Sequence, residues 1–311
     1  MANAIETNGL TRKFGERLAV DKLDLAIPQG KVFGFLGPNG AGKTTTVRML
    51  AALIAPTDGS ATVNGHEVGR DDTAIRRSVG ILTETPGLYD RLTAHQNLVF
   101  FAQLYEVPEK RASEQAGYYL RALGLEERRN DKVGGFSKGM RQKLALARAF
   151  MHEPAVVFLD EPTAGLDPEA SRTVRQFVKE LRSEGRTIFL TTHNLPEADE
   201  LCDLIGVFQT RLLQIGTPAH LRSLLFGRGT VIKTEGDASR WESVATALPF
   251  VRQATAQDGA LSVTLDDPDA QNPALVHALV AAGASIRYVE PMAHSLEDVY
   301  LELLDEKNLA Q

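Results

Sequence analysis

A short apolar run followed by a glycine-rich loop and a helix-forming segment constrains this chain more than any other feature. Residues 31–36 read KVFGFL, residues 37–44 read GPNGAGKT, and residues 45–50 read TTVRML. The loop matches G-x-x-x-x-G-K-[ST], in which glycines let the backbone wrap closely around phosphate oxygens. A strand, loop and helix in this order direct backbone N–H groups and the positive end of the helix at an anion. The sequence therefore predicts an α/β domain that binds a nucleoside triphosphate.

Each position of this phosphate loop has a predicted role. Lys43 is expected to place its charge at the β- and γ-phosphates, Thr44 to ligate Mg²⁺ through its hydroxyl, and Thr45 to donate to the α-phosphate. The rest of the loop is expected to surround the phosphates: Gly37, Pro38, Asn39, Gly40, Ala41 and Gly42. The alternative is a plain glycine turn, but every fixed position and both flanks match the motif.

A second apolar run, residues 155–159, ends in two acidic residues. Its continuous hydrophobicity is typical of a strand buried on both faces of a parallel sheet. Asp160 at the end of that strand is expected to hold Mg²⁺ through water, and Glu161 to act as the general base that orients the attacking water. The alternative is a strand that ends in two solvated acids. The phosphate loop upstream makes this alternative the weaker interpretation.

Four further motifs follow in a fixed order. Residues 136–140 read FSKGM, and residues 160–163, 165–167 and 192–193 read DEPT, GLD and TH. Together they resemble the signature motif and the next three motifs of ABC-type ATPases, over roughly residues 5–217. The resemblance implies an α/β fold of the ABC-type P-loop class. That fold has a parallel-sheet core, an antiparallel β subdomain and a helical subdomain.

The resemblance also implies a nucleotide site shared by two copies of the chain. Ser137 and the Gly139 N–H of one copy would contact the γ-phosphate of ATP held by the phosphate loop of the other. Asp167 would lie at the boundary between the copies, and His193 would contact the γ-phosphate and fix the water and Glu161. Independently of the resemblance, Ser137 is a favourable N-cap for a helix over residues 138–150. A cap role alone is the alternative for this residue.

Three positions depart from the family's common pattern. The usual L-S-G-G-Q appears as FSKGM, so that Lys138 replaces the first glycine and Met140 the glutamine. Glu84 falls where the family has a glutamine; as a carboxylate it is predicted to ligate Mg²⁺, with a solvated loop acid as the alternative. Phe14 stands where an adenine-stacking tyrosine is most common. Its π-face preserves that role, and a core phenylalanine is the alternative.

Charge and composition limit the partners and the compartment. A formal charge of −6 argues against nucleic acid as the main ligand, because phosphate backbones attract clustered Lys and Arg. The single cysteine, Cys202, excludes an internal disulfide and favours a reducing compartment. No run approaches the ~18 apolar residues of a membrane span, and no signal peptide pattern opens the chain. We therefore expect a cytoplasmic protein that is peripheral at the cell membrane through a partner.

The chain is expected to contain two domains. Residues 1–216 form the ABC ATPase domain, with its helical subdomain at about 88–151, and residues 217–311 form an accessory α+β domain. The second domain has the predicted order β-α-β-β-α-β, which suggests a ferredoxin-like sandwich. Its predicted helices include residues 239–248 and 273–282. The tail, residues 291–301, resembles ATPases that serve exporters of drugs, antibiotics, lipids or sodium.

These features predict the ATPase subunit of an ABC exporter. Two copies would enclose two ATP–Mg²⁺ and drive a separately encoded polytopic permease. The first alternative is a soluble ABC ATPase acting on ribosomes or DNA, but the chain has one motif set, no sustained heptad pattern and an acidic balance. The second is a module that no longer hydrolyses ATP, against which Glu161 and His193 argue.

Overall fold

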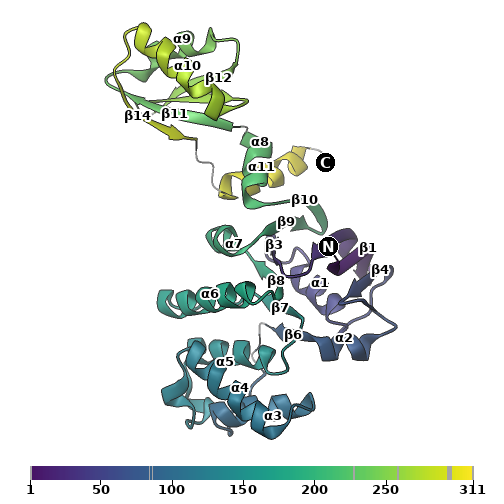
Figure 1. Ribbon diagram of the computed structural model, residues 1–311. Helices are drawn as coiled ribbons and strands as arrows, with labels where there is room; N and C mark the ends of the chain where they lie inside the picture. The colour runs from purple at the N-terminus through teal and green to yellow at the C-terminus, as the bar shows by residue number, and fades with distance from the viewer. Residues whose placement is uncertain are drawn as a thin grey trace. The chain divides into compact units, whose positions relative to one another are not determined.

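The chain divides into two compact units, residues 1–218 and 219–311, each with its own hydrophobic core (Figure 1). The computed structural model describes residues 2–83, 85, 87–226, 228–257, 259–292 and 296–309. Within these ranges, no helix combines the length and the apolarity required to cross a bilayer. The phosphate loop and the residues that follow β7 and β8 belong to the first unit.

The first unit contains two sheets. The larger has the order β10-β9-β3-β8-β7-β6, and the smaller has the order β2-β1-β4-β5. The strands of the larger sheet are β3 (Val32–Leu36), β6 (Val79–Leu82), β7 (Val156–Asp160), β8 (Thr187–Thr192), β9 (Leu204–Gln209) and β10 (Arg211–Gly216). Those of the smaller are β1 (Asn3–Phe14), β2 (Arg17–Pro28), β4 (Asp58–Val63) and β5 (His66–Glu67). The larger sheet is parallel except for the β9–β10 pair, and the smaller is antiparallel.

The register of the parallel strands sets the place of the site. Leu36 at the end of β3 pairs with Thr192 at the end of β8, and Asp160 at the end of β7 pairs with Thr191. All residues of β3, β7 and β8 are buried, as their continuous apolar runs predict. The loops that follow these three strands therefore leave the sheet at one edge.

The helices of the first unit, in the part of it that the structure describes, are α1 (Lys43–Leu50), α2 (Asp72–Ser78), α3 (Ala94–Leu104), α4 (Glu109–Ala122), α5 (Lys138–Phe150), α6 (Pro168–Ser183) and α7 (Leu195–Leu201). Two short 3₁₀ turns, Glu126–Arg128 and Val133–Gly135, separate α4 from α5. Helices α3, α4 and α5 lie together as a group (Figure 1). They fall within the stretch predicted to be helical.

The sequence places capping residues at Thr93 and Ser137, and both begin a helix. The Thr93 hydroxyl accepts from the Gln96 N–H in a capping box, and the Ser137 hydroxyl accepts from the Met140 N–H. The apolar spacing of the sequence predicts a further helix from Glu114, but helix α4 begins at Glu109. The earlier start agrees with the proline directly before it and with the acidic residue in its first turn.

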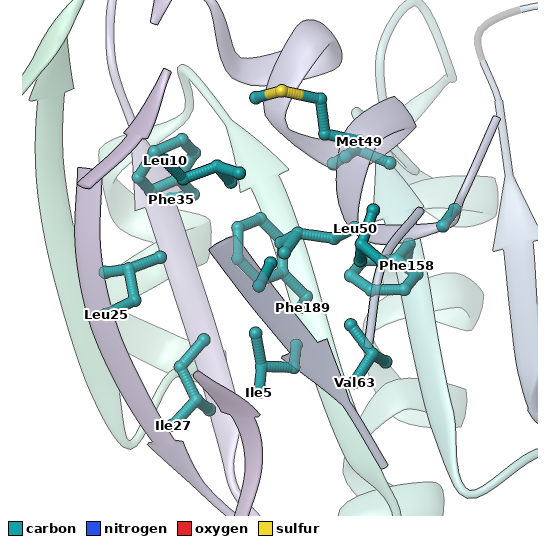
Figure 2. Close-up of a cluster of buried hydrophobic side chains, with 14 of the residues drawn as sticks. Ile5, Leu10, Leu25, Ile27, Phe35, Met49, Leu50, Val63, Phe158 and Phe189 are labelled. Carbon is teal, nitrogen blue, oxygen red and sulfur yellow. The ribbon is translucent and has the colours of Figure 1, made fainter. Parts of the chain in front are cut away.

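The core of the first unit joins both sheets to α1. Figure 2 shows this cluster, in which side chains from β1, β2 and β4 meet Met49 and Leu50 of α1 and phenylalanines of the parallel strands. The Phe189 ring of β8 lies 5.3 Å from Phe35 of β3 and 5.7 Å from Phe158 of β7. Each buried phenylalanine contributes about 1.5–3 kcal/mol to folding. The packing therefore holds the strands that carry the site in fixed relative positions.

The second unit contains an antiparallel sheet with the order β12-β13-β11-β14. Its elements are α8 (Pro218–Phe226, whose first residue closes the first unit), β11 (Arg228–Thr234), a 3₁₀ turn (Ala238–Trp241), α9 (Glu242–Thr246), β12 (Val251–Gln257), β13 (Ala260–Leu265), α10 (Pro268–Ala281), β14 (Ile286–Pro291) and α11 (Leu296–Leu309). The prediction that one helix starts at Pro273 is wrong, because Asp267 caps α10 and Pro268 occupies its first turn. The helix predicted over residues 239–248 is a 3₁₀ turn followed by a single short helix.

Gly80 of β6 offers a test of the packing between the larger sheet and α5. A Cβ added at this position would lie 2.1 Å from the Ala149 carbonyl oxygen and 2.9 Å from Pro154 Cγ. We expect Gly80→Ala to lower Tm by about 2–10 °C, because backbone must shift to relieve the overlap. Gly135→Ala is the matched control, since an added Cβ there would have no atom of the described residues within 4 Å. Equal Tm values for the two variants in thermal unfolding would contradict the described packing.

Candidate functional site

The phosphate loop and the ends of β7 and β8 surround a cavity of about 530 Å³. This volume is within the range of small-molecule sites. The lining residues are Phe14, Arg17, Ala19, Pro38, Asn39, Gly40, Ala41, Gly42, Lys43, Thr44, Thr45, Asp160, Glu161, Ala164 and His193. The structure thus brings together most of the residues predicted to bind the nucleotide. Gly37 is outside the lining, and its carbonyl accepts a 2.6 Å hydrogen bond from Lys43 Nζ.

The loop conformation requires glycine at Gly42. Its φ is +106°, and an added Cβ would lie 2.2 Å from the Ala19 carbonyl oxygen of β2. Gly42 directly precedes α1, and its carbonyl accepts from both the N–H and the hydroxyl of Thr46. The close approach to β2 holds the loop at the start of α1, where free N–H groups can bind an anion.

Lys43 is buried beneath the loop and makes several short contacts. Its Nζ donates to the carbonyls of Gly37 at 2.6 Å and Pro38 at 3.2 Å, and it lies 3.7 Å from Glu161 Oε1. Burial lowers the pKa of Lys43, and the charges of Glu161 and Asp160 act in the opposite direction. Two backbone carbonyls and a carboxylate thus surround the ammonium group.

Glu161 lies between Lys43 and the histidine that follows β8. Its Oε2 is 2.7 Å from His193 Nδ1, while Oε1 faces Lys43. The Glu161 backbone has a φ of +51°, a left-handed conformation that non-glycine residues rarely adopt. Its N–H donates to the Thr191 carbonyl at 3.0 Å, which holds this turn against β8. Strained conformations of this kind cluster at functional sites.

Asp160 and Thr44 provide the oxygen atoms that a hard cation prefers. Both line the cavity, and Asp160 is otherwise buried at the end of β7. The Thr191 hydroxyl donates to Asp160 Oδ1, which orients the carboxylate. One carboxylate and one hydroxyl suit Mg²⁺, which takes few protein ligands and completes its shell with phosphates and water. These residues therefore fit a magnesium ion.

The predicted base-binding aromatic and the predicted partner-contacting residues lie in different places. Phe14 at the end of β1 lines the cavity and is 47% exposed, so it is not the core residue of the alternative interpretation. Ser137 and Gly139 at the start of α5 are outside the lining of the cavity. Asp167 caps α6 by accepting from the Ala170 N–H at 2.8 Å. Glu84 lies outside the described residues.

Sequence analysis missed a buried carboxylate that joins the two loops of the site. Glu197 of α7 is 2% exposed, and its carboxylate accepts 2.8 Å hydrogen bonds from the hydroxyls of Thr163 and Thr192. Its N–H donates to Asn194 Oδ1 at 3.1 Å. Thr163 follows Glu161 by two residues, and Thr192 directly precedes His193. Two sequence features could have indicated this carboxylate. Two hydroxyl residues end an apolar strand, and an acidic residue follows three positions after an N-cap Asn.

The residue pattern of the ABC transporter family matches residues 20–164. The linearmycin resistance ATP-binding protein LnrL of Bacillus subtilis (strain 168) is 32% identical over 302 residues, covering 96% of each chain. The daunorubicin/doxorubicin resistance ATP-binding protein DrrA of Streptomyces peucetius is 36% identical over 304 residues, covering 96% of this chain and 92% of that protein. Similar solved structures include an ATP-binding subunit of an ABC transporter, with 30% identity and a TM-score of 0.67 over 72% of this chain and 94% of that one.

The fold and the site define a P-loop ATPase of the ABC class. The chain belongs to the family of ABC transporter ATP-binding proteins. It binds ATP and hydrolyses it to power transport. This result confirms the predicted ATPase function and favours transport over the alternatives of a ribosome- or DNA-directed ATPase and a non-hydrolysing module.

The Glu197 carboxylate predicts a pH-dependent stability difference. Burial raises the pKa of Glu197 above its ordinary value of 4.5. The folded state therefore loses stability as pH rises from 4.5 through the pKa of the folded protein, because the buried carboxylate must then ionise. Glu197→Gln stays neutral and changes the hydrogen bonds by an amount that does not depend on pH. We expect Tm of the variant minus Tm of the wild type to be higher at about pH 8 than at about pH 5, as measured by thermal unfolding.

Glu200→Gln is the control on the same helix. A hydrogen bond from Lys179 lowers the pKa of the exposed Glu200, so that its contribution to stability is lost only as pH falls below the ordinary value of 4.5. Its Tm difference should be flat between about pH 5 and pH 8. A flat difference for Glu197→Gln as well would show that the buried carboxylate is not disfavoured by burial.

Proposed function

We propose that two copies of this chain enclose two ATP–Mg²⁺ and use the closure and reopening of this dimer to drive an exporter permease. The observation that carries the proposal is the distribution of the predicted site residues. Glu161, His193 and Lys43 line the cavity at the phosphate loop. Ser137 and Gly139 lie outside it. Ser137 is exposed at the N-terminus of α5, where a second copy can present its nucleotide.

The chemistry assigned to one copy is in-line attack of water on the γ-phosphate. Glu161 would accept a proton from the water, and His193, 2.7 Å away, would hold the carboxylate in place. Lys43 would exchange its carbonyl contacts for phosphate oxygens. Thr44 and Asp160 would hold Mg²⁺, which supplies charge neutralisation at the phosphates.

The second copy would contribute an anion site at the start of α5. The Ser137 hydroxyl already accepts from Met140 N–H, so it can still donate to a phosphate oxygen. The Gly139 N–H is among the first helical N–H groups, which have no intrahelical acceptor. Gly139 also lies close to Asp167, because an added Cβ at Gly139 would be 3.9 Å from Asp167 Oδ2. The start of α5 and the residue that caps α6 would thus face the second copy together.

The partner that would convert this motion into transport is a separately encoded polytopic permease. The names of several relatives support export of antibiotic-like compounds. The B. subtilis protein is named for resistance to linearmycin, and the S. peucetius protein for resistance to daunorubicin and doxorubicin. A further relative, the bacitracin transport ATP-binding protein BcrA of Bacillus licheniformis, is 40% identical over 71% of this chain and 72% of that protein. We place the protein at the cytoplasmic face of the cell membrane through this permease.

The proposed accessory domain, residues 217–311, would support the dimer or regulate it. The sheet order β12-β13-β11-β14 with α9 and α10 in the crossovers supports a ferredoxin-like sandwich. The relatives from B. subtilis and S. peucetius match over 96% of this chain, so the similarity extends into this domain.

Glu161→Gln tests the shared site. The amide cannot accept the proton, so turnover should fall by about 10²–10⁴-fold, while ATP binding and dimer closure persist. Phosphate release measures the first effect, and light scattering with ATP measures the trapped dimer. Lys43→Ala is the control that should lose ATP binding and remain monomeric. A Glu161→Gln protein that stays monomeric at saturating ATP, with and without permease, would rule out the shared-site mechanism.

Glu84 is proposed as a further magnesium ligand, because a carboxylate oxygen is a hard donor. Glu84→Ala should then require more Mg²⁺ for half-maximal ATPase activity, and Glu84→Gln should require an intermediate amount because an amide oxygen is a weaker ligand. Phosphate release over a Mg²⁺ titration measures both. Unchanged Mg²⁺ dependence in the two variants would leave Glu84 as a solvated loop acid.

A further inference from the structure

Phe14, the residue proposed to stack on the adenine, has a cation on one face of its ring. Arg12 Cζ lies 4.6 Å from the ring centroid. This distance is within the ~6 Å over which cation–π attraction operates. Because Phe14 is 47% exposed and lines the phosphate-loop cavity, the ring remains accessible from the cavity while Arg12 packs against it.

Arg12 is held in this position by the fold. Its Nη1 donates to the Ala55 carbonyl at 2.8 Å. Its Nε is buried and has no hydrogen-bond partner within the described residues. The guanidinium is thus partly buried beside the ring and does not extend into solvent as an unattached surface charge does.

The Ala55 contact ties Arg12 to the segment that follows α1. Ala55 lies in the segment that follows α1, and α1 begins at Lys43. Arg12 therefore bridges the aromatic residue at the end of β1 and the segment beyond the C-terminus of α1. The hydrogen bond to this segment holds the guanidinium against the ring.

We propose that Arg12 is a positioning residue for nucleotide binding, whose guanidinium holds the Phe14 ring so that its accessible face is presented to the adenine. The inference rests on the proposed stacking role of Phe14. A half-exposed ring without this contact has rotamer freedom that the nucleotide must remove on binding. Holding the ring beforehand should improve the affinity for ligands that contain a base, and leave the affinity for phosphate chains unchanged.

Arg12→Met tests the inference, because methionine keeps an unbranched apolar side chain and removes the cation. Isothermal titration calorimetry of the full-length chain should show about two- to fivefold weaker binding of ADP–Mg²⁺. Binding of inorganic tripolyphosphate–Mg²⁺ should be unchanged. Lys13→Met is the matched control: it removes the same charge one residue along the strand and should leave both affinities unchanged.

The Phe14→Leu background separates positioning from direct attraction of phosphate. Phe14→Leu alone should weaken ADP binding, and adding Arg12→Met should have no further effect, because Arg12 acts through the ring. Equal weakening of ADP and tripolyphosphate in Arg12→Met, or an undiminished effect in the Phe14→Leu background, would overturn the inference. So would unchanged ADP affinity in Arg12→Met.

Failure of the stacking proposal gives a different result. Phe14→Leu with unchanged ADP affinity would contradict stacking itself, and with it the role of Arg12. A deleterious Phe14→Leu combined with a neutral Arg12→Met would leave stacking intact and overturn only the inference. Thermal unfolding of each variant checks that the fold is retained.

Discussion

The parallel pairing of β3, β7 and β8 is the constraint on which the site depends. It places the phosphate loop after β3, the two acids at the end of β7 and His193 after β8 at one edge of the sheet. A shift of one residue in the pairing of β7 would turn Asp160 away from the cavity. The packed phenylalanines of these strands oppose such a shift, because each ring would lose its buried contacts. The hydrophobic core and the geometry of the candidate site are thus set by the same contacts.

The charged groups of the site are paired with one another and with backbone carbonyls. Lys43 is satisfied by two carbonyls and lies near Glu161, and Glu161 is also held by His193. Burial lowers the pKa of Lys43, and the negative charge of a triphosphate would act in the opposite direction and favour the charged ammonium. The carbonyl contacts cost little to replace, since a phosphate oxygen is a stronger acceptor for an ammonium than a neutral carbonyl. These contacts therefore hold Lys43 at the loop and still let its ammonium move to a phosphate oxygen.

Local patterns in the sequence predicted the parts of the site that depend on neighbours along the chain. The glycine-lysine spacing of the phosphate loop, the apolar strand before Asp160 and the N-cap at Ser137 are all of this kind. The contacts that sequence analysis missed join residues far apart: Thr191 with Asp160, Glu197 with Thr163, and Arg12 with Ala55. Residues of these types are common on protein surfaces, and no fixed spacing along the chain indicates that they are in contact. Only the fold shows that Glu197 is buried and that Arg12 covers an aromatic ring. Helix starts at Glu109 and Pro268 were missed because proline can open a helix as well as interrupt one.

The segments of Glu161 and His193 are held more firmly than the Lys43 side chain is. The Glu197 carboxylate accepts from one hydroxyl beside the turn of Glu161 and from another beside His193. Removing either donor would leave a buried charge short of a hydrogen bond, which costs about 1–3 kcal/mol or more. The relative position of the Glu161 and His193 segments is therefore stiff. Lys43, in contrast, is bound to carbonyls that a phosphate can replace. In the proposed mechanism, a firmly held Glu161 and an exchangeable Lys43 would have the general base in position when the triphosphate binds. Positioning that base would then add nothing to the entropy lost in the transition state.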